Sequence, residues 1–281
     1  MSPDQRLPVR RTAKLFIGGQ FPRSESGRTY EVVSADGRFL AHAARASRKD
    51  LRDAVVAARG ALAGWAARTA YNRGQILYRV AEIMEGRRAQ LEDELRDSGA
   101  ADPADEVSRA IDRWVWYAGW ADKIAQVAGG ANPVAGPYFN FTVPEPTGVV
   151  GIIAPAEPSL LGLVSRIAPA IVSGNVAVAV ASESSPLPAV SLAEALATSD
   201  VPGGVINVLT GSPRELVPWL AAHMDVNAID LTGCPDDLFP EAERAAADNV
   251  KRVHRAGPAE QHLSEITAFV EFKTVWHPMG A

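Results

Sequence analysis

The sequence predicts an α/β protein whose second half forms a doubly wound parallel sheet. Short apolar runs alternate there with longer stretches of helical periodicity, which is the order that βαβ units produce. The apolar runs are continuous, as in strands that are covered by helices on both faces. The predicted strands and helices alternate as 149–153, 160–172, 176–181, 187–198, 205–209, 213–223, 228–231 and 235–248. Ligands of such sheets bind beyond the carboxyl ends of the strands.

The first half predicts short strands followed by long helices. Residues 1–14 carry arginines and prolines without periodicity, and we expect them to form a flexible arm. Ser47 is a predicted N-cap for the first long helix. Trp114, Trp116 and Trp120 lie at helical spacing, which is more typical of helix packing than of a ligand platform. The predicted strands are 15–21, 38–42 and 138–143, and the predicted helices are 47–67, 70–97 and 103–127.

The composition predicts a soluble, cytoplasmic protein. The chain has 281 residues, 47% of them hydrophobic and 22% charged, which is ordinary for a globular protein. A formal net charge of −5 gives no reason to expect nucleic acid or an anionic membrane as a partner. The start lacks the apolar segment of a secretory signal, and the longest apolar run, 176–181, is far shorter than the ~20 residues of a membrane span. A single cysteine excludes an intramolecular disulfide, and the histidine spacing predicts no metal site.

Residues with possible chemistry follow several of the predicted strands, but no GxGxxG or GxxxxGK[ST] loop occurs. The segment Thr232–Pro235 enters a predicted helix, where backbone N–H groups could hold a phosphate, or the same residues could equally form an ordinary first turn with Pro235 at the first helical position. Cys234 is either a nucleophile activated by that terminus or a small, partly buried side chain, and no histidine is spaced to act as its base. Glu157 and Glu183 both follow strands and could form a carboxylate pair, or repel phosphate from a shared crevice.

The second half also carries the motifs of a known family. In order and spacing they resemble the coenzyme domain of aldehyde dehydrogenases, and the N-terminal helices and edge strand fit the same arrangement. The residues that carry the resemblance are Pro146–Pro155, Ile167–Asn175, Val201–Gly211, Leu231–Gly233 and Asn249–Val253. The resemblance implies a Rossmann-like domain whose vestigial cofactor-binding positions are Ala154, Pro155, Ser182, Glu183, Gly211, Thr232, Gly233 and Cys234. Phe272–Trp276 resembles the C-terminal strand that adds to a neighbouring subunit.

The positions that carry catalysis in the family differ here. Glu157 takes the place of an asparagine that donates to the oxyanion, and an ionised carboxylate can only accept hydrogen bonds. Val180 replaces a ribose-binding lysine, and Ala256 stands where the catalytic glutamate is expected. A short segment, 258–275, takes the place of the domain that bears the catalytic thiol. The resemblance therefore implies no catalytic residues, and NAD(P) that binds weakly or not at all.

Within this family, one subgroup resembles the sequence more closely than the others. The segments 155–165, 198–204 and 275–280 resemble the degenerate second unit of family 16 aldehyde dehydrogenases, in which an inactive unit is joined to an active one. The resemblance divides the chain into a flexible arm (1–14), N-terminal strands and three long helices (15–137), an edge strand of an oligomerisation arm (138–145), a Rossmann-like β/α core (146–257) and a C-terminal strand of that arm (258–281).

These observations favour a catalytically inactive aldehyde-dehydrogenase-like subunit with a structural or regulatory role. The expected partner is an active aldehyde dehydrogenase subunit or a second copy, bound through strands 138–143 and 268–276. We expect the C-terminal strand to pair with the other subunit rather than to fold back onto its own sheet. Two alternatives remain open: a residual NAD-linked aldehyde oxidoreductase that uses Cys234, and a sensor that binds a nucleotide or metabolite in the crevice.

Overall fold

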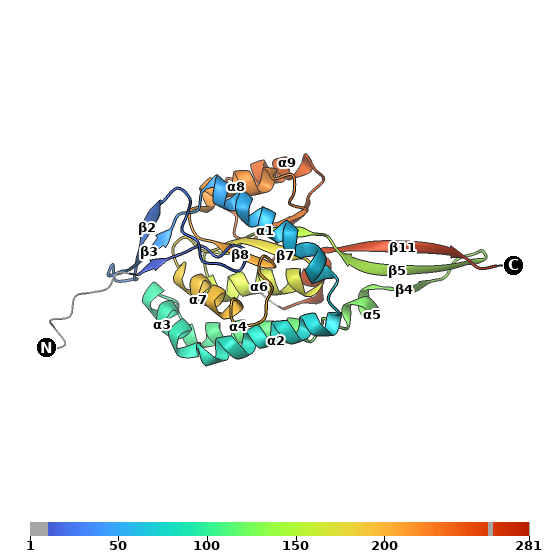
Figure 1. Cartoon of the computed structure of the whole chain (residues 1–281), viewed down its shortest axis with the longest axis horizontal. Coiled ribbons are helices and arrows are strands. Elements are labelled where there is room, and N and C mark those ends of the chain that lie inside the picture. Colours follow the sequence, from blue (N-terminus) through green and yellow to red (C-terminus); the bar gives the residue numbers. More distant parts are fainter. Residues whose placement is uncertain (1–10, 258–260, 281) are drawn as a thin grey trace.

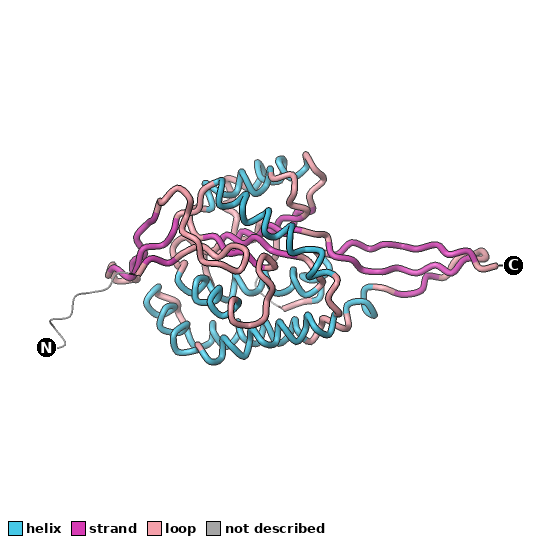
Figure 2. Tube along the Cα trace, viewed as in Figure 1, coloured by secondary structure: helices cyan, strands magenta, loops and turns pink. Residues whose placement is uncertain are grey.

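A helix-covered sheet with a long projecting arm makes up the computed structural model, which describes residues 11–257 and 261–280. Figure 1 shows the arm leaving one end of the body, with a small N-terminal sheet at the other end. Figure 2 shows the central strands lying between layers of helices. Residues 1–10 of the predicted flexible arm at 1–14 lie outside the described residues, and the prediction was wrong for Thr12 and Ala13, which form a strand paired with the segment 42–43.

The small N-terminal sheet has the strand order β1-β3-β2. Its strands are β1 (Thr12–Ala13), β2 (Thr29–Val33) and β3 (Phe39–Ala44). The prediction of a strand at 15–21 was wrong, because Gly18 and Gly19 adopt positive φ and leave only isolated bridges at Phe16 and Ile17. The strand β2 has no clear signal in the sequence, since Val32 is its only buried residue.

The long helices of the first half are more broken than their periodicity predicts. The helices are α1 (Arg48–Ala66), α2 (Ala70–Gly86), α3 (Arg88–Ser98), α4 (Pro103–Ala118) and α5 (Ile124–Ala128). Ser47 caps α1 through a capping box with Asp50, as its position predicts. Arg87 interrupts the second predicted helix, and its N–H donates a hydrogen bond to the carbonyl of Met84 in a tight turn. Gly119 ends α4, so the third predicted helix also divides in two.

The central sheet is parallel, with the order β10-β9-β6-β7-β8, which confirms the predicted doubly wound topology. Its strands are β6 (Val149–Ile153), β7 (Val176–Val180), β8 (Ile206–Leu209), β9 (Ala228–Asp230) and β10 (Arg252–His254). The covering helices are α6 (Ser159–Val172), α7 (Leu187–Leu196), α8 (Pro213–Ala222) and α9 (Phe239–Ala247). Every residue of β6 and β7 is buried, because helices cover both faces. In Figure 1, α1, α8 and α9 lie above the sheet, and α6 and α7 lie below it with α2–α4 as an outer layer.

The helix expected at 235–248 starts four residues later, at Phe239. Residues 235–238 form a separate turn in which the N–H groups of Leu238 and Phe239 both donate to the carbonyl of Pro235. Pro240 rather than Pro235 is therefore the proline in the first helical turn. The predicted phosphate-binding terminus is consequently not where the sequence placed it.

The arm is a three-stranded antiparallel sheet in the order β11-β5-β4. Its strands are β4 (Gly130–Asn132), β5 (Tyr138–Pro146) and β11 (Val270–Pro278). The short helix α10 (Leu263–Thr267) joins the body to β11. The strand β11 pairs with β5 of its own chain over nine residue pairs, so the expectation that it pairs instead with another subunit was wrong. Within one chain the two strands need no loss of translational freedom to meet, which favours the internal pairing.

No helix in the described part of the chain is long and apolar enough to cross a membrane.

Candidate functional site

The predicted site residues lie in loops at the carboxyl ends of the parallel strands, and two of these loops touch. The sheet order reverses between β6 and β9, where doubly wound sheets have their ligand crevice. There the N–H of Gly233 donates to the carbonyl of Ile153 at 2.8 Å. A Cβ added at Gly233 would lie 2.0 Å from the carbonyl oxygen of Ala154, so only glycine fits. The structure thus brings Ala154 and Gly233 together at this edge of the sheet.

Glu157 lies on an exposed loop beside other acids. It borders a cavity of about 440 Å³ together with Asp102, Asp105, Glu106 and the single cation Arg109. One oxygen of Glu106 accepts the N–H groups of Leu160 and Leu161 at the start of α6. The helix terminus that could hold an anion is therefore already occupied by a carboxylate. This environment opposes an oxyanion rather than stabilising it.

Cys234 does not have the surroundings of a nucleophile. Its side chain is 4% exposed, and burial raises the pKa of the thiol. The thiolate is the reactive form, so this shift lowers its reactivity at neutral pH. The structure supports the interpretation of Cys234 as a small buried side chain. Ala256, at the expected position of the general base, contributes an N–H that donates to the Thr232 hydroxyl, and its methyl side chain has no acid or base function.

Glu183 is paired with Arg45 and not with Glu157. Arg45, just after β3, donates to the Glu183 carboxylate at 3.3 Å, and its Nε lies 3.1 Å from Glu215 on α8. Glu157 and Glu183 share none of the described cavities, and no hydrogen bond joins them in the described residues. The predicted carboxylate pair thus has no support in the structure. Ser182 and Gly211 complete the edge; a Cβ at Gly211 would lie 3.0 Å from the amide of Ala46.

A buried ionic cluster under the same edge was missed by sequence reasoning. Arg166 on α6 is fully buried, and its guanidinium lies 2.5 Å from Glu265 and 3.8 Å from Asp230. His254 contacts the same Glu265 oxygen at 3.0 Å. Burial raises the pKa of Asp230, with Arg166 acting against it. The only signal in the sequence was charged residues inside apolar stretches, at Arg166 and Asp230.

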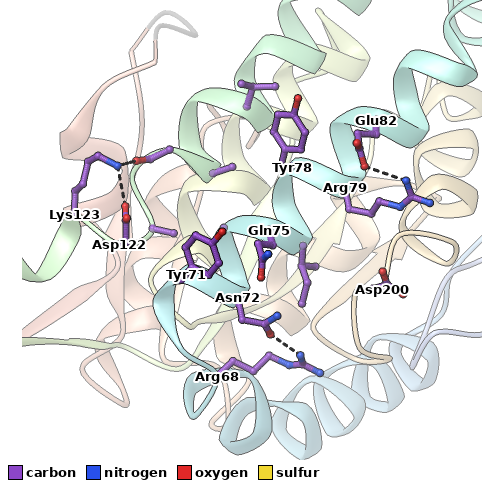
Figure 3. A pocket seen from close by; sticks show the side chains of 16 residues that line it. Arg68, Tyr71, Asn72, Gln75, Tyr78, Arg79, Glu82, Asp122, Lys123 and Asp200 are labelled. Carbon is purple, nitrogen blue, oxygen red and sulfur yellow. Dashed lines mark hydrogen bonds and ion pairs between the residues drawn. The ribbon is translucent and has the colours of Figure 1, made fainter.

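The largest of the described cavities lies elsewhere, between α2 and the end of α4, and was not predicted. It measures about 990 Å³ and contains none of the predicted site residues. Figure 3 shows Tyr71, Gln75 and Tyr78 of α2 along one wall. Its cations have partners within the wall: Arg68 with Asn72, Arg79 with Glu82 and Lys123 with Asp122. The cavity therefore shows no charge that calls for a particular ligand.

Within residues 11–257 and 261–280, no group of three His, Cys, Asp or Glu side chains is placed to hold a metal ion. The tryptophans of α4 pack as expected: Trp114 is fully buried, and Trp116 contacts Tyr117 and Trp120.

Comparisons with known proteins point to one family. The model of the aldehyde dehydrogenase family matches residues 21–261. The chain is 34% identical over 256 residues to cytosolic 10-formyltetrahydrofolate dehydrogenase of Pongo abelii, covering 87% of the chain and 28% of that protein. It is 34% identical over 260 residues to retinal dehydrogenase 2 of Homo sapiens, covering 90% and 49%. The chain thus spans between about a quarter and a half of these relatives.

Solved structures agree with this. The HpcC structure from Thermus thermophilus superposes with a TM-score of 0.82 at 33% identity, over 87% of this chain and 48% of that one. The NAD⁺ complex of an aldehyde dehydrogenase from Bacillus cereus superposes with a TM-score of 0.80 at 28% identity, over 86% of this chain and 50% of that one.

Proposed function

Since the chain belongs to the aldehyde dehydrogenase family, we propose that it is a non-catalytic subunit that assembles with an active aldehyde dehydrogenase through its β4–β5–β11 arm. The observation that carries the proposal is the exposed apolar surface of that arm. Directly opposite residues of paired strands share a face, and the faces alternate along each strand. One face of the arm presents Tyr138, Phe272 and Trp276, and the other presents Phe139, Val143 and Val275.

These six side chains are between 38% and 58% exposed. Large apolar side chains on both faces of a thin projecting sheet are unusual for a surface that stays in water. The outer edge of β11 also has no partner strand among the described residues, so its backbone groups can accept an added strand. Both features support the binding of a partner subunit to the arm.

The site supports the non-catalytic half of the proposal. The buried Cys234 has a raised thiol pKa, Glu157 faces other acids, and Ala256 has no base function. The bridge from β10 to β11 contains only the short helix α10 in its described part, where the resemblance implies a thiol-bearing domain. These features disfavour a residual oxidoreductase that relies on Cys234.

Two measurements test the proposal. The purified chain should form no NADH from aldehydes with NAD⁺ above the buffer rate. When co-expressed with an active aldehyde dehydrogenase from its own genome, it should co-purify as one species in native mass spectrometry. The double variant Phe139→Glu/Trp276→Glu places a charge on each face of the arm and should abolish that species. The control Tyr71→Glu changes an exposed aromatic residue on α2 and should leave it intact. Co-purification that survives the arm variant would contradict the proposed surface.

A further inference from the structure

The coenzyme of a doubly wound domain is held at two poles. An acid after the second strand accepts hydrogen bonds from ribose hydroxyls, and backbone amides at a helix N-terminus hold the phosphates. In this chain the second strand is β7, followed by Glu183, and the helix that follows the topological switch point is α9. Each pole must offer its groups unoccupied if a dinucleotide is to bind.

The ribose pole is occupied by an arginine of the chain itself. Arg45 donates to Glu183 at 3.3 Å and also contacts Glu215 at 3.1 Å. Glu215 is further held by Arg28 at 2.9 Å. Tyr30 lies next to this group, and the pKa of its hydroxyl is raised by burial and then by the Glu183 charge. The Glu183 carboxylate is therefore already paired with a cation, and ribose hydroxyls would have to compete with Arg45 for it.

The N–H groups of the phosphate pole are bonded within the chain, and two carboxylates lie in the turn that follows. The N–H of Cys234 is bonded to the carbonyl of Leu231, and that of Gly233 to Ile153, so neither amide is available to an anion. The next turn carries Asp236 and Asp237. Asp237 accepts two hydrogen bonds from Arg214, at 2.6 and 3.0 Å, and Asp236 pairs with Arg255. Both aspartates are exposed, Asp237 to 60% and Asp236 to 90%, so they do not fill the pole, but they engage the two arginines that a phosphate there could bind.

We propose that the chain itself engages the groups of both poles, with Arg45 paired to Glu183 at the ribose pole and Asp236 and Asp237 paired to Arg255 and Arg214 at the phosphate pole, and that NAD(P) therefore does not bind. The ion pairs instead tie α8 to the segment after β3 and to the turn before α9. The place where the family binds its coenzyme therefore holds ion pairs that connect these segments without a ligand. This inference concerns the crevice only and does not depend on assembly through the arm.

Calorimetry with NAD⁺ tests the proposal directly. The wild-type chain should show a dissociation constant above about 1 mM, which is a binding free energy weaker than about −4 kcal/mol. The variant Arg45→Ala/Asp236→Asn/Asp237→Asn opens both poles and should bind NAD⁺ at least about tenfold more tightly. The matched control Arg79→Ala/Glu82→Gln removes an exposed ion pair of α2 and should bind as weakly as the wild type.

Smaller probes separate the two poles. Arg45→Ala should raise the affinity for adenosine, which has a ribose and no phosphate, and Arg45→Gln serves if the alanine variant fails to fold. Asp236→Asn/Asp237→Asn should raise the affinity for ADP more than that for adenosine. Micromolar NAD⁺ binding by the wild type overturns the proposal. It is equally overturned if the folded triple variant binds NAD⁺ no better than the wild type, because the shape of the crevice would then be the barrier.

Discussion

Replacing Arg166 with methionine should destabilise the protein and loosen the base of the arm. The Arg166 side chain is 2% exposed and lies between Glu265 and Asp230, at 2.5 and 3.8 Å. Methionine fills a similar volume, so the main effect is the loss of the positive charge. Removing one member of a buried ion pair leaves the other charge without compensation and costs about 3–5 kcal/mol. We expect a loss in the free energy of unfolding in that range at pH 7.

The loss should shrink in mild acid, and the sign follows from Asp230. Burial raises its pKa in the folded state, and Arg166 opposes that rise. Without Arg166 the carboxyl takes up a proton more readily, which relieves the unpaired charge. Between the folded pKa and the unfolded value of about 3.9, the folded state binds more protons, so stability rises as the pH falls. The difference between variant and wild type should therefore be smaller at pH 5 than at pH 7.

In the wild type the pKa of Glu265 is shifted downward, opposite to that of Asp230. Burial acts to raise its pKa, but hydrogen bonds from His254 and Arg166 lower it overall. Its contribution to stability is present above the unfolded pKa of about 4.3 and is lost as the pH falls through the folded value. Because Glu265 lies on α10, which leads into β11, losing its arginine partner should weaken the attachment of the arm.

Urea denaturation followed by tryptophan fluorescence measures the free energy, and amide hydrogen exchange of residues 263–270 measures the local loosening. The control Arg79→Met removes an exposed partner of Glu82, where a surface pair contributes between about 0 and 1 kcal/mol. The reasoning is refuted if Arg166→Met and Arg79→Met are equally stable at pH 7. Unchanged exchange in α10 would refute the link to the arm.

Three further changes probe other parts of the structure. Lys251→Met should lower the free energy of unfolding by roughly 2–4 kcal/mol, because the Lys251 ammonium donates to the carbonyls of His223 and Val226 and to the Asn249 side chain. A fall in melting temperature no larger than that of an exposed lysine variant would argue against this. Gly148→Ala should cost roughly 3 kcal/mol in a denaturant titration, since φ is 134° and a Cβ would lie 2.3 Å from the Asn227 side-chain oxygen; a wild-type midpoint would contradict it. Glu157→Asn should yield no NADH from aldehydes, because one restored donor does not supply a nucleophile; any measurable rate would refute the assignment.

Local patterns were sufficient for most of the second half of the chain. The predicted strand at 149–153 and the observed β6 coincide, and the helix predicted at 160–172 differs from α6 by one residue. Continuous apolar runs and glycines such as Gly174 at a helix end carry this information within a few residues of themselves. Apolar periodicity says less about breaks, which is why Arg87 and Gly119 divide helices that were predicted whole.

The sequence by itself determined the parallel α/β core, the order of its elements and the residues that stand at its carboxyl edge. Only the tertiary structure decided what those residues contact. Arg45 and Glu183 are 138 positions apart, and Arg166 and Glu265 are 99 apart, so no local pattern could pair them. The turn before α9 likewise pairs residues far apart in the sequence, Asp236 with Arg255 and Asp237 with Arg214. The partner of β11 also depended on chain geometry: its apolar β-pattern suits any free edge, and β5 of the same chain was within reach.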